Sequence, residues 1–294
     1  RTSPFILTVR AREVHLLDII DALSLAGSRA RPNDDVWGMA RNRVWVIDGA
    51  TGLGDPIVSD TSDAAWLAHR ANELFVRHAG CHDAMPMLES VAKDLEAAFL
   101  RERRRAPLER WEIPCGAFMM LTARNDGVCE LAWTADCRAI LVGSDGETHA
   151  FGATAESEAR EAGGAAAVRV ADPAERLRAP ESLARLRAGR ARYNQPGGPF
   201  TLAPDPAFVA GVRTARVALK TPAHALLMTD GFAALELRYG DIGAAAFVAA
   251  AREEGLVRLA LRLRHIEEEL DPAAVRFPRW KRSDDATAAL VAIA

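Results

Sequence analysis

The sequence predicts an α+β fold in which helices and antiparallel strands occupy separate stretches of the chain. Apolar residues recur at helical spacing over residues 60–79 and 85–103, whereas residues 116–152 contain short apolar runs divided by turn residues. A further strand-like run closes the chain at 286–294. Because strands near both ends can join one sheet system, we predict a single domain over residues 1–294.

The composition is that of an ordinary globular protein. Apolar residues make up 49% and charged residues 26% of the 294 residues, which is enough for a sizeable core. Lys and Arg total 37 against 40 Asp and Glu, whereas a nucleic-acid binder usually has a basic excess. The longest uncharged apolar stretches, such as 242–251, are about half as long as a membrane-spanning helix. We therefore expect no nucleic-acid partner and no membrane span, and the oligomeric state stays open.

Cysteine usage and the first residues favour a cytoplasmic protein. Four cysteines in 294 residues are far fewer than a disulfide scaffold contains, and three of them lie in or beside apolar, strand-like runs. Residues 1–10 lack the charged, then apolar, then small pattern of a signal peptide. We expect reduced thiols and a cytoplasmic location.

The first predicted elements are a strand and two helices. The apolar run 43–48 ends in a glycine-rich turn, as a buried strand does when it delivers its last residue, an aspartate, to the edge of a sheet. The two helical segments follow, and Asp60 or Thr61 is the expected cap of the first. The next runs, at 116–123, 129–135 and 138–143, predict strands of an antiparallel meander, continued by a hairpin turn with the sequence Ser-Asp-Gly-Glu.

Residues 154–206 break this pattern, because Ala, Gly, Arg and Pro dominate there. Such a long irregular segment is usually a functional lid or a mobile insertion, so we expect a flap-like insertion with short helical pieces such as 180–189. Strand-like runs resume at 212–219 and 224–229. The remaining helical patterns lie at 233–237, 241–251 and 256–270.

Several carboxylates stand at the edges of apolar runs. They are Asp48, Asp136, Asp230 and the pair Asp284-Asp285, and a further pair, Asp34-Asp35, precedes the run 43–48. Taken singly, each is explained as an ordinary turn residue. Converging carboxylates repel each other unless a cation lies between them, and hard divalent ions such as Mg²⁺ and Mn²⁺ prefer these oxygen ligands.

Five short motifs, in this order and spacing, resemble the metal-dependent protein phosphatases of the 2C (PPM) type, including bacterial members. The motifs are Asp34-Asp35, Val-Ile-Asp-Gly-Ala-Thr-Gly at 46–52, Ala-Asp-Cys-Arg-Ala at 135–139, Met-Thr-Asp-Gly at 228–231 and Ser-Asp-Asp-Ala-Thr at 283–287. The resemblance extends over roughly residues 29–294. It implies a β-sandwich of two antiparallel sheets flanked by helices on both sides, with metals in a cleft at one end.

The resemblance also implies roles for individual residues. Asp48, Asp230 and Asp284 would form the catalytic core, in which Asp48 bridges two Mg²⁺ or Mn²⁺ ions. The full implied set of metal-binding residues is Asp34, Asp35, Asp48, Gly49, Asp136, Asp230 and Asp284, with Asp136 at a third, weaker metal site. Either Arg29 or Arg31 would bind phosphate, since an arginine fork can hold two phosphate oxygens.

The implied activity is metal-dependent hydrolysis of a phosphomonoester, with a phosphorylated protein as substrate. A protein serine/threonine phosphatase of this kind uses a water that bridges two divalent metals, so no protein nucleophile is required. Several positions depart from the family pattern, among them Ala50, which stands where some members have His, and Cys115, which begins the stretch where Gly-Thr-Thr is more usual. These departures leave an alternative open, a catalytically weak or inactive phosphatase-like regulatory or binding module.

Two further signals complete the interpretation. His78, Cys81 and His82 have the residue types of a zinc site, but a fourth ligand is missing and a solvated helix end is favoured. The arginines of the insertion are expected to attract a phosphorylated partner, so the insertion would select substrates. They include Arg185, Arg187, Arg190 and Arg192.

Overall fold

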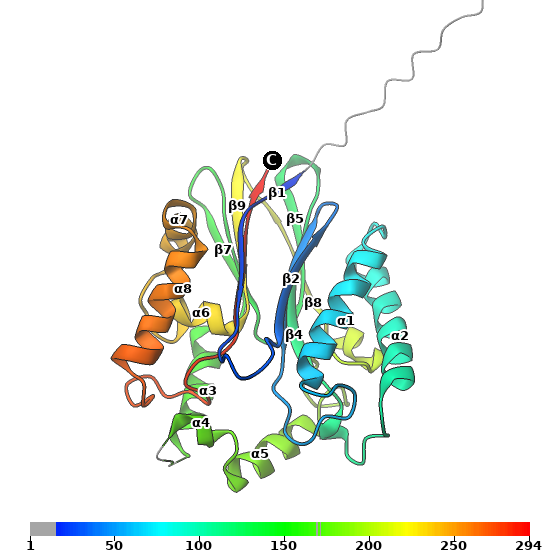
Figure 1. Ribbon diagram of the computed structural model, residues 1–294. Helices are drawn as coiled ribbons and strands as arrows, with labels where there is room; N and C mark the ends of the chain where they lie inside the picture. The colour runs from blue at the N-terminus through cyan, green and yellow to red at the C-terminus, as the bar shows by residue number, and fades with distance from the viewer. Residues whose placement is uncertain (1–15, 169, 171) are drawn as a thin grey trace, which may run out of the picture.

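Two five-stranded antiparallel sheets face each other in this computed structural model, which describes residues 16–168, 170 and 172–294 (Figure 1). The first sheet has, in order across it, β1 (Leu17–Leu25), β10 (Ala286–Ile293), β9 (Ala223–Met228), β6 (Arg138–Val142) and β7 (Thr148–Gly152). The second sheet has β2 (Asp35–Ala40), β3 (Arg43–Gly49), β4 (Gly116–Ala123), β5 (Val128–Thr134) and β8 (Arg213–Ala218).

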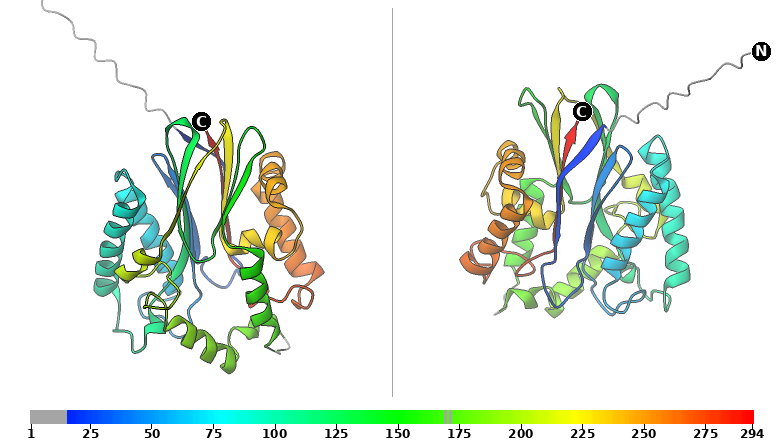
Figure 2. Two further views of the ribbon diagram at one scale, coloured as in Figure 1. Left: turned by 180° about the vertical axis from the view of Figure 1, so that it is seen from behind. Right: turned by 45° about the horizontal axis from the view of Figure 1, so that its top comes forward.

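Helices cover the outer face of each sheet (Figures 1 and 2). The second sheet carries α1 (Asp63–His78) and α2 (Ala84–Glu102), and the first carries α6 (Asp230–Leu237), α7 (Ala244–Glu254) and α8 (Leu256–His265). The insertion forms α3 (Ala155–Ala166), α4 (Pro173–Arg176) and α5 (Pro180–Arg190) beside one end of the sheets. Short helical turns lie at Arg110–Glu112, Asn125–Gly127, Pro206–Gly211 and Ile266–Leu270. The predicted α+β sandwich with helices on both sides is confirmed.

Strand β3 shows why the central strands are continuous apolar runs. Val44 and Val46 point into the core between the two sheets, whereas Trp45 and Ile47 pack on the other face against α1 and α2. Because both faces of the strand are buried, the polar alternation of a half-exposed strand is lost. Each such large side chain contributes about 1.5–3 kcal/mol when fully buried. The strand is thereby held rigidly, and its last residues, including Asp48, are carried to the edge of the sandwich.

The strands from 116 to 152 do not form one meander, so that prediction is wrong. Strand β5 pairs with β4 and β8 in the second sheet, whereas β6 pairs with β7 and β9 in the first. The chain crosses between the sheets just after Ala135, whose φ of 56° turns it out of the extended conformation. The crossing places Asp136 at the end of the sandwich.

Two strands precede the first one that was expected. Both β1 and β2 are edge strands with many half-buried or exposed side chains, so neither has a continuous apolar run. Pairing of β1 with β10 joins the two ends of the described chain.

Helix α1 is capped by Ser62, not by Asp60 or Thr61, because the Ser62 Oγ accepts a hydrogen bond from the Ala65 amide at 3.2 Å.

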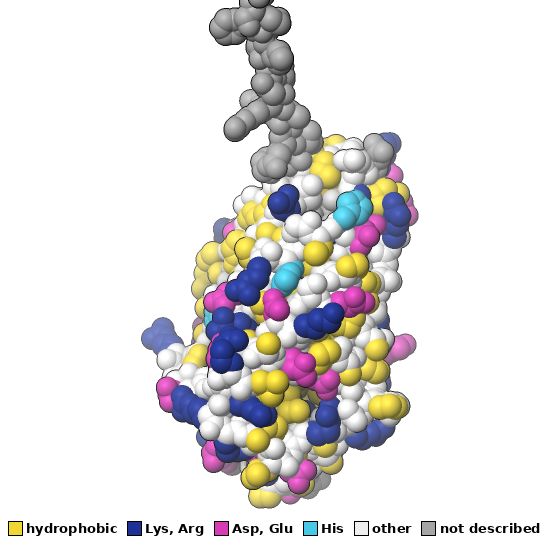
Figure 3. Space-filling model, turned by 90° about the vertical axis from the view of Figure 1, so that its right-hand side faces the viewer, with side chains coloured by type: hydrophobic (Ala, Val, Ile, Leu, Met, Phe, Trp, Pro, Cys, Tyr) yellow, Lys and Arg dark blue, Asp and Glu magenta, His cyan; other side chains and the backbone are white. Residues whose placement is uncertain are grey.

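The surface over α1 and α2 mixes charges of both signs (Figure 3). Arg70 pairs with Glu73 and Glu102, which lie on the two different helices.

Among the described residues, no helix combines the length and the apolar composition needed to cross a bilayer. All four cysteines lie within the described ranges and are free thiols, as expected, while residues 1–10 of the signal-peptide prediction lie outside those ranges.

Glu112 holds the loop that connects α2 to β4. Its carboxylate accepts two hydrogen bonds from Arg105, at 2.7 and 3.0 Å, and one from the Leu108 amide at 2.5 Å. The Arg105 hydrogen bonds are the main reason that the pKa of Glu112 falls from 4.5 to about 2. We expect Glu112→Gln to lower the free energy of unfolding by about 1 kcal/mol at pH 7, as loss of a helix-cap carboxylate does.

The stabilisation that Glu112 provides decreases as the pH is lowered. Because the pKa of Glu112 is lowered on folding, the stabilisation is present above about pH 4.5 and is lost as the pH falls through about 2. Urea unfolding of the wild type and Glu112→Gln at pH 7 and pH 2 tests this, with the exposed Glu89→Gln on α2 as the control. A stability difference of the same size at both pH values would contradict the ionic explanation.

Candidate active site

A cleft of about 650 Å³ opens at the end of the sheets where the insertion lies. Strand ends and the loops that follow them line it, together with side chains from α3 and α5. The sequence-predicted residues that line this cleft are Asp48, Gly49, Asp136, Asp230 and Asp284. The sandwich therefore brings five residues from four distant motifs to one site.

The end of β3 is packed too tightly for any side chain at Gly49. A Cβ there would lie 2.6 Å from the Ala64 carbonyl oxygen and 2.7 Å from that of Asp34. The Gly49 amide donates to the same Asp34 oxygen at 3.0 Å. Asp48 is paired with Asp35 on β2 and Ala117 on β4, so its backbone is fixed on both sides.

Asp230 is the first residue of α6 and follows directly after β9. Its neighbour Gly231 is required by close contact, since a Cβ there would lie 2.0 Å from the Asp285 carbonyl oxygen. The carboxyl groups of Asp48 and Asp230 are close enough to share a hydrogen bond. Burial and the charge of Asp230 raise the pKa of Asp48 well above its usual range. The pKa of Asp230 is raised too, by burial and by Asp284.

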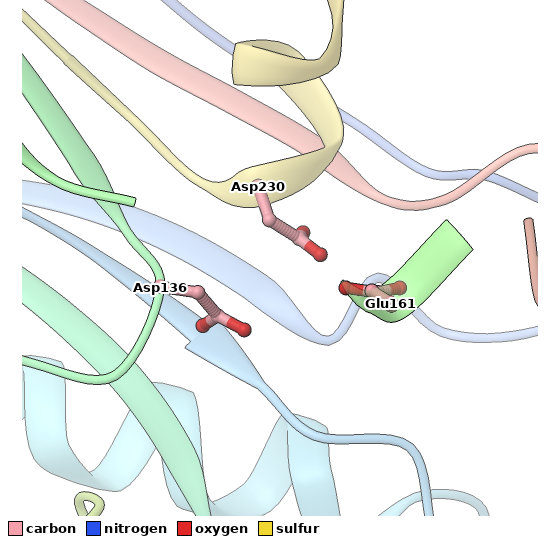
Figure 4. A group of neighbouring side chains, drawn as sticks. All are labelled: Asp136, Glu161 and Asp230. Atoms are coloured by element: carbon pink, nitrogen blue, oxygen red, sulfur yellow. The ribbon is translucent and has the colours of Figure 1, made fainter. Parts of the chain in front are cut away.

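Three carboxylates point into one shared space (Figure 4). One ligand oxygen from each of Asp136, Glu161 and Asp230 lies within 4.8 Å of the others, and within the described ranges no other group of this kind is present. Asp136 is open to the cleft, yet withdrawal from bulk water and the charge of Asp230 raise its pKa to about 7. The same two causes raise the pKa of Glu161 to about 8. All donors are hard oxygens, which is the chemistry that Mg²⁺ and Mn²⁺ prefer.

Asp284 differs from the other carboxylates because it has a cationic partner. The Lys281 ammonium donates to its Oδ1 at 2.5 Å, and the Asp285 amide donates to the same oxygen at 2.9 Å. Burial opposes ionisation, but Lys281 outweighs it and the pKa of Asp284 is lowered. The same contact raises the pKa of Lys281, so the pair stays ionised.

Asp34 and Asp35 are buried beside the cleft and do not line it. The Asp34 carboxylate accepts from the Ser62 hydroxyl at 2.5 Å, and that of Asp35 from the Thr229 hydroxyl at 2.6 Å. Burial raises both pKa values. Asp285 ties these loops together, since its two oxygens accept from the Gly27 and Asp34 amides, each at 2.7 Å.

The cations of the site do not include Arg29, which is exposed and outside the cleft. Arg31 lines a smaller adjoining pocket of about 140 Å³, and Arg190 from α5 lines both this pocket and the main cleft. Arg213, at the start of β8, also lines the main cleft. Arg238 and Arg279 line it as well, so the structure adds three arginines, Arg213, Arg238 and Arg279, to the Arg190 of the insertion.

The insertion is fastened to the rest of the molecule by its arginines. Arg187 donates to the Leu53 carbonyl oxygen at 2.6 and 3.0 Å, and its guanidinium lies 4.2 Å from the centre of the Trp111 ring. Arg190 donates to the Thr51 carbonyl oxygen at 3.0 Å. These contacts place α5 against the loop that follows Asp48.

Sequence reasoning missed Glu161 and Lys281. A signal for Glu161 is present, because Glu158 and Glu161 are three residues apart on α3 and both pair with Arg238. No comparable pattern marks Lys281. The alternative zinc site is not assembled: His78 lies 2.8 Å from Asp94 instead, and no zinc-type group of three ligands occurs in the part of the chain that is described.

Neither a family model nor a curated protein sequence matches this chain. Several solved structures, however, have a similar fold. The serine/threonine phosphatase PstP/Ppp of Mycobacterium tuberculosis is 14% identical with a TM-score of 0.52 over 94% of this chain and 98% of that one. The serine/threonine phosphatase of S. agalactiae is 13% identical, with a TM-score of 0.52 over 95% and 100%. The catalytic domain of PstP in complex with two manganese ions is 15% identical, with a TM-score of 0.50 over 94% and 98%.

Proposed function

The chain has the fold of the metal-dependent protein phosphatases of the 2C type, and from this premise we propose that it hydrolyses phosphomonoesters with the help of divalent metal ions. One observation carries the proposal: Asp48, Asp136, Asp230 and Asp284 line one cleft, although they come from four segments that are far apart in the sequence. Mutually repelling carboxylates of this kind need a cation between them.

Asp48, Asp230 and Asp284 are the proposed catalytic core and would hold two Mg²⁺ or Mn²⁺ ions, with help from the Gly49 carbonyl. Their oxygen donors suit these ions, and a similar fold is known with two manganese ions. Asp136 and Asp230 would hold a third ion, which Glu161 is placed to share. When bound, such ions polarise the phosphoryl group and acidify the attacking water. Asp34 and Asp35 would support the second ion from the buried side of the cleft.

Arginines that line the cleft support a phosphorylated substrate. Arg190 and Arg213 line the cleft, and Arg31 lines the adjoining pocket. Arginine forks bind two phosphate oxygens at once and would orient the phosphoryl group towards the carboxylate core. We infer that the substrate is a protein phosphorylated on serine or threonine, with Arg31 a better placed phosphate ligand than Arg29.

A phosphatase-like binding module with little turnover is the second candidate. The contact between Lys281 and Asp284 favours it, because an ammonium already occupies one oxygen of a proposed metal ligand. Ala50 adds to this, since a methyl group cannot donate a proton to a leaving group.

Hydrolysis of p-nitrophenyl phosphate distinguishes the two candidates. We expect turnover with Mn²⁺ or Mg²⁺ and a loss of at least about a hundredfold after EDTA treatment, because the proposed mechanism uses a metal-activated water and not a protein nucleophile. Adding Mn²⁺ back should restore the rate. Full activity in chelator-treated protein would exclude the metal mechanism, and no activity with any metal would favour the binding module.

A further inference from the structure

Lys281 is a half-buried cation that contacts one of the carboxylates lining the cleft. Its ammonium lies 2.5 Å from the Asp284 Oδ1, and its side chain is 28% exposed. The other two lysines of the chain, Lys93 and Lys220, are exposed and lie outside the cleft. A single lysine is thus placed among the proposed metal ligands.

The local backbone fixes this arrangement. The Asp284 Oδ1 also accepts the Asp285 amide at 2.9 Å, and the Asp284 carbonyl oxygen accepts Arg264 at 2.7 Å. Because Asp284 is held at both its carboxylate and its backbone, it cannot turn away from Lys281 freely. A divalent ion at Asp284 would therefore meet a positive charge within a few ångströms.

Two other cations near Asp284 are already paired elsewhere, Arg238 with Glu158 and Glu161 and Arg279 with Asp271. Asp48, Asp136 and Asp230 also line the cleft, and their mutual repulsion opposes folding when no metal is present. The ammonium offsets part of that repulsion. A cation that stabilises the empty cleft must also compete with a second cation for the same carboxylates.

We propose that Lys281 is a tethered counter-ion of the metal cleft: it stabilises the metal-free protein and weakens the binding of divalent metal at Asp284. This rests on the proposed function, because it assumes that Asp284 is a metal ligand. Lys281 acts here as a positioning residue, through Asp284. Divalent metal therefore binds at Asp284 only at a concentration high enough to compete with the ammonium. The protein remains folded when no metal is bound.

Replacing the lysine separates these two effects. In Lys281→Met, which keeps the length of the side chain and removes its charge, we expect the dissociation constant for Mn²⁺ to fall by at least about tenfold. The melting temperature of the metal-free protein should fall, while the rise caused by Mn²⁺ should be larger than in the wild type. A residue that merely supported the fold would lower stability and weaken metal binding together.

Isothermal titration of chelator-treated protein with Mn²⁺, and thermal unfolding with and without Mn²⁺, measure both quantities. Lys281→Arg keeps the charge and should bind Mn²⁺ within about threefold of the wild type. Lys93→Met on α2 is the matched control for losing a lysine, and Lys281→Gln replaces Lys281→Met if that variant does not fold. If the wild type binds Mn²⁺ and Lys281→Met binds it no more tightly, this inference falls and the proposed function stands. If no variant binds Mn²⁺, both fall.

Discussion

Asp230→Asn is expected to lower the rate of phosphomonoester hydrolysis by at least about a thousandfold. Asp230 has several neighbours of like charge, since it is close to Asp48 and shares a site with Asp136 and Glu161. An amide cannot supply the negative charge that a divalent ion requires, so metal binding and phosphoryl activation are lost together. The fold should survive, because asparagine has the same shape.

The same change should make the metal-free protein more stable. Removing one charge relieves repulsion within the carboxylate cluster, and we expect the melting temperature to rise by about 2–4 °C. Asp145→Asn in the exposed hairpin turn is the control, because its hydrogen bond to the Glu147 amide can be kept by an asparagine oxygen. Wild-type hydrolysis in Asp230→Asn would remove this residue from the proposed site, whereas a large drop in melting temperature would mean that its role is structural.

The positions of these carboxylates could be predicted because each one follows or precedes an apolar run. In β3, β9 and β10 both faces are buried, so the strands read clearly in the sequence and their ends can be located to within a residue or two. The order of the motifs then indicated the sandwich. Which residues act in catalysis remains a prediction.

The sheet assignment could not be predicted in the same way. Apolar periodicity says that a segment is a strand, but it does not say which strand lies beside it. The crossing at Ala135 depends on one residue with positive φ, which no turn signal such as Gly or Asn marks. Edge strands β1 and β2 were missed because Asp, Ser or Gly residues interrupt their apolar residues, so neither contains a continuous apolar run.

Glu161 and Lys281 show a second limit. Glu161 reaches the cleft only because α3 packs beside it, and Lys281 only because the chain before β10 turns towards Asp284. Both placements result from tertiary packing of segments that have no regular pattern. Residues of this kind can be identified only from the distances between side chains in the folded structure.

Removing the contacts that hold α5 against the rest of the protein should impair the hydrolysis of phosphoproteins. The hydrolysis of small substrates should be nearly unaffected. Helix α5 has one buried residue, Ser182, so apolar packing contributes little to its position. Arg187 holds it instead, through two hydrogen bonds to Leu53 and its contact with Trp111. Together such contacts are worth roughly 2–3 kcal/mol, which is enough to keep the helix docked.

We therefore expect Arg187→Ala to lower kcat/KM for a phosphoprotein by about tenfold and to change that for p-nitrophenyl phosphate by no more than about twofold. A protein substrate would extend along the wall that α5 forms, whereas a small aryl phosphate would meet α5 chiefly at Arg190, which keeps its own hydrogen bond to the Thr51 carbonyl oxygen. Arg178→Ala, an exposed arginine of the same insertion, controls for the lost charge. Equal losses on both substrates would mean that α5 supports the loop after Asp48 and hence the chemistry itself. No loss on either would leave the insertion without a part in substrate selection.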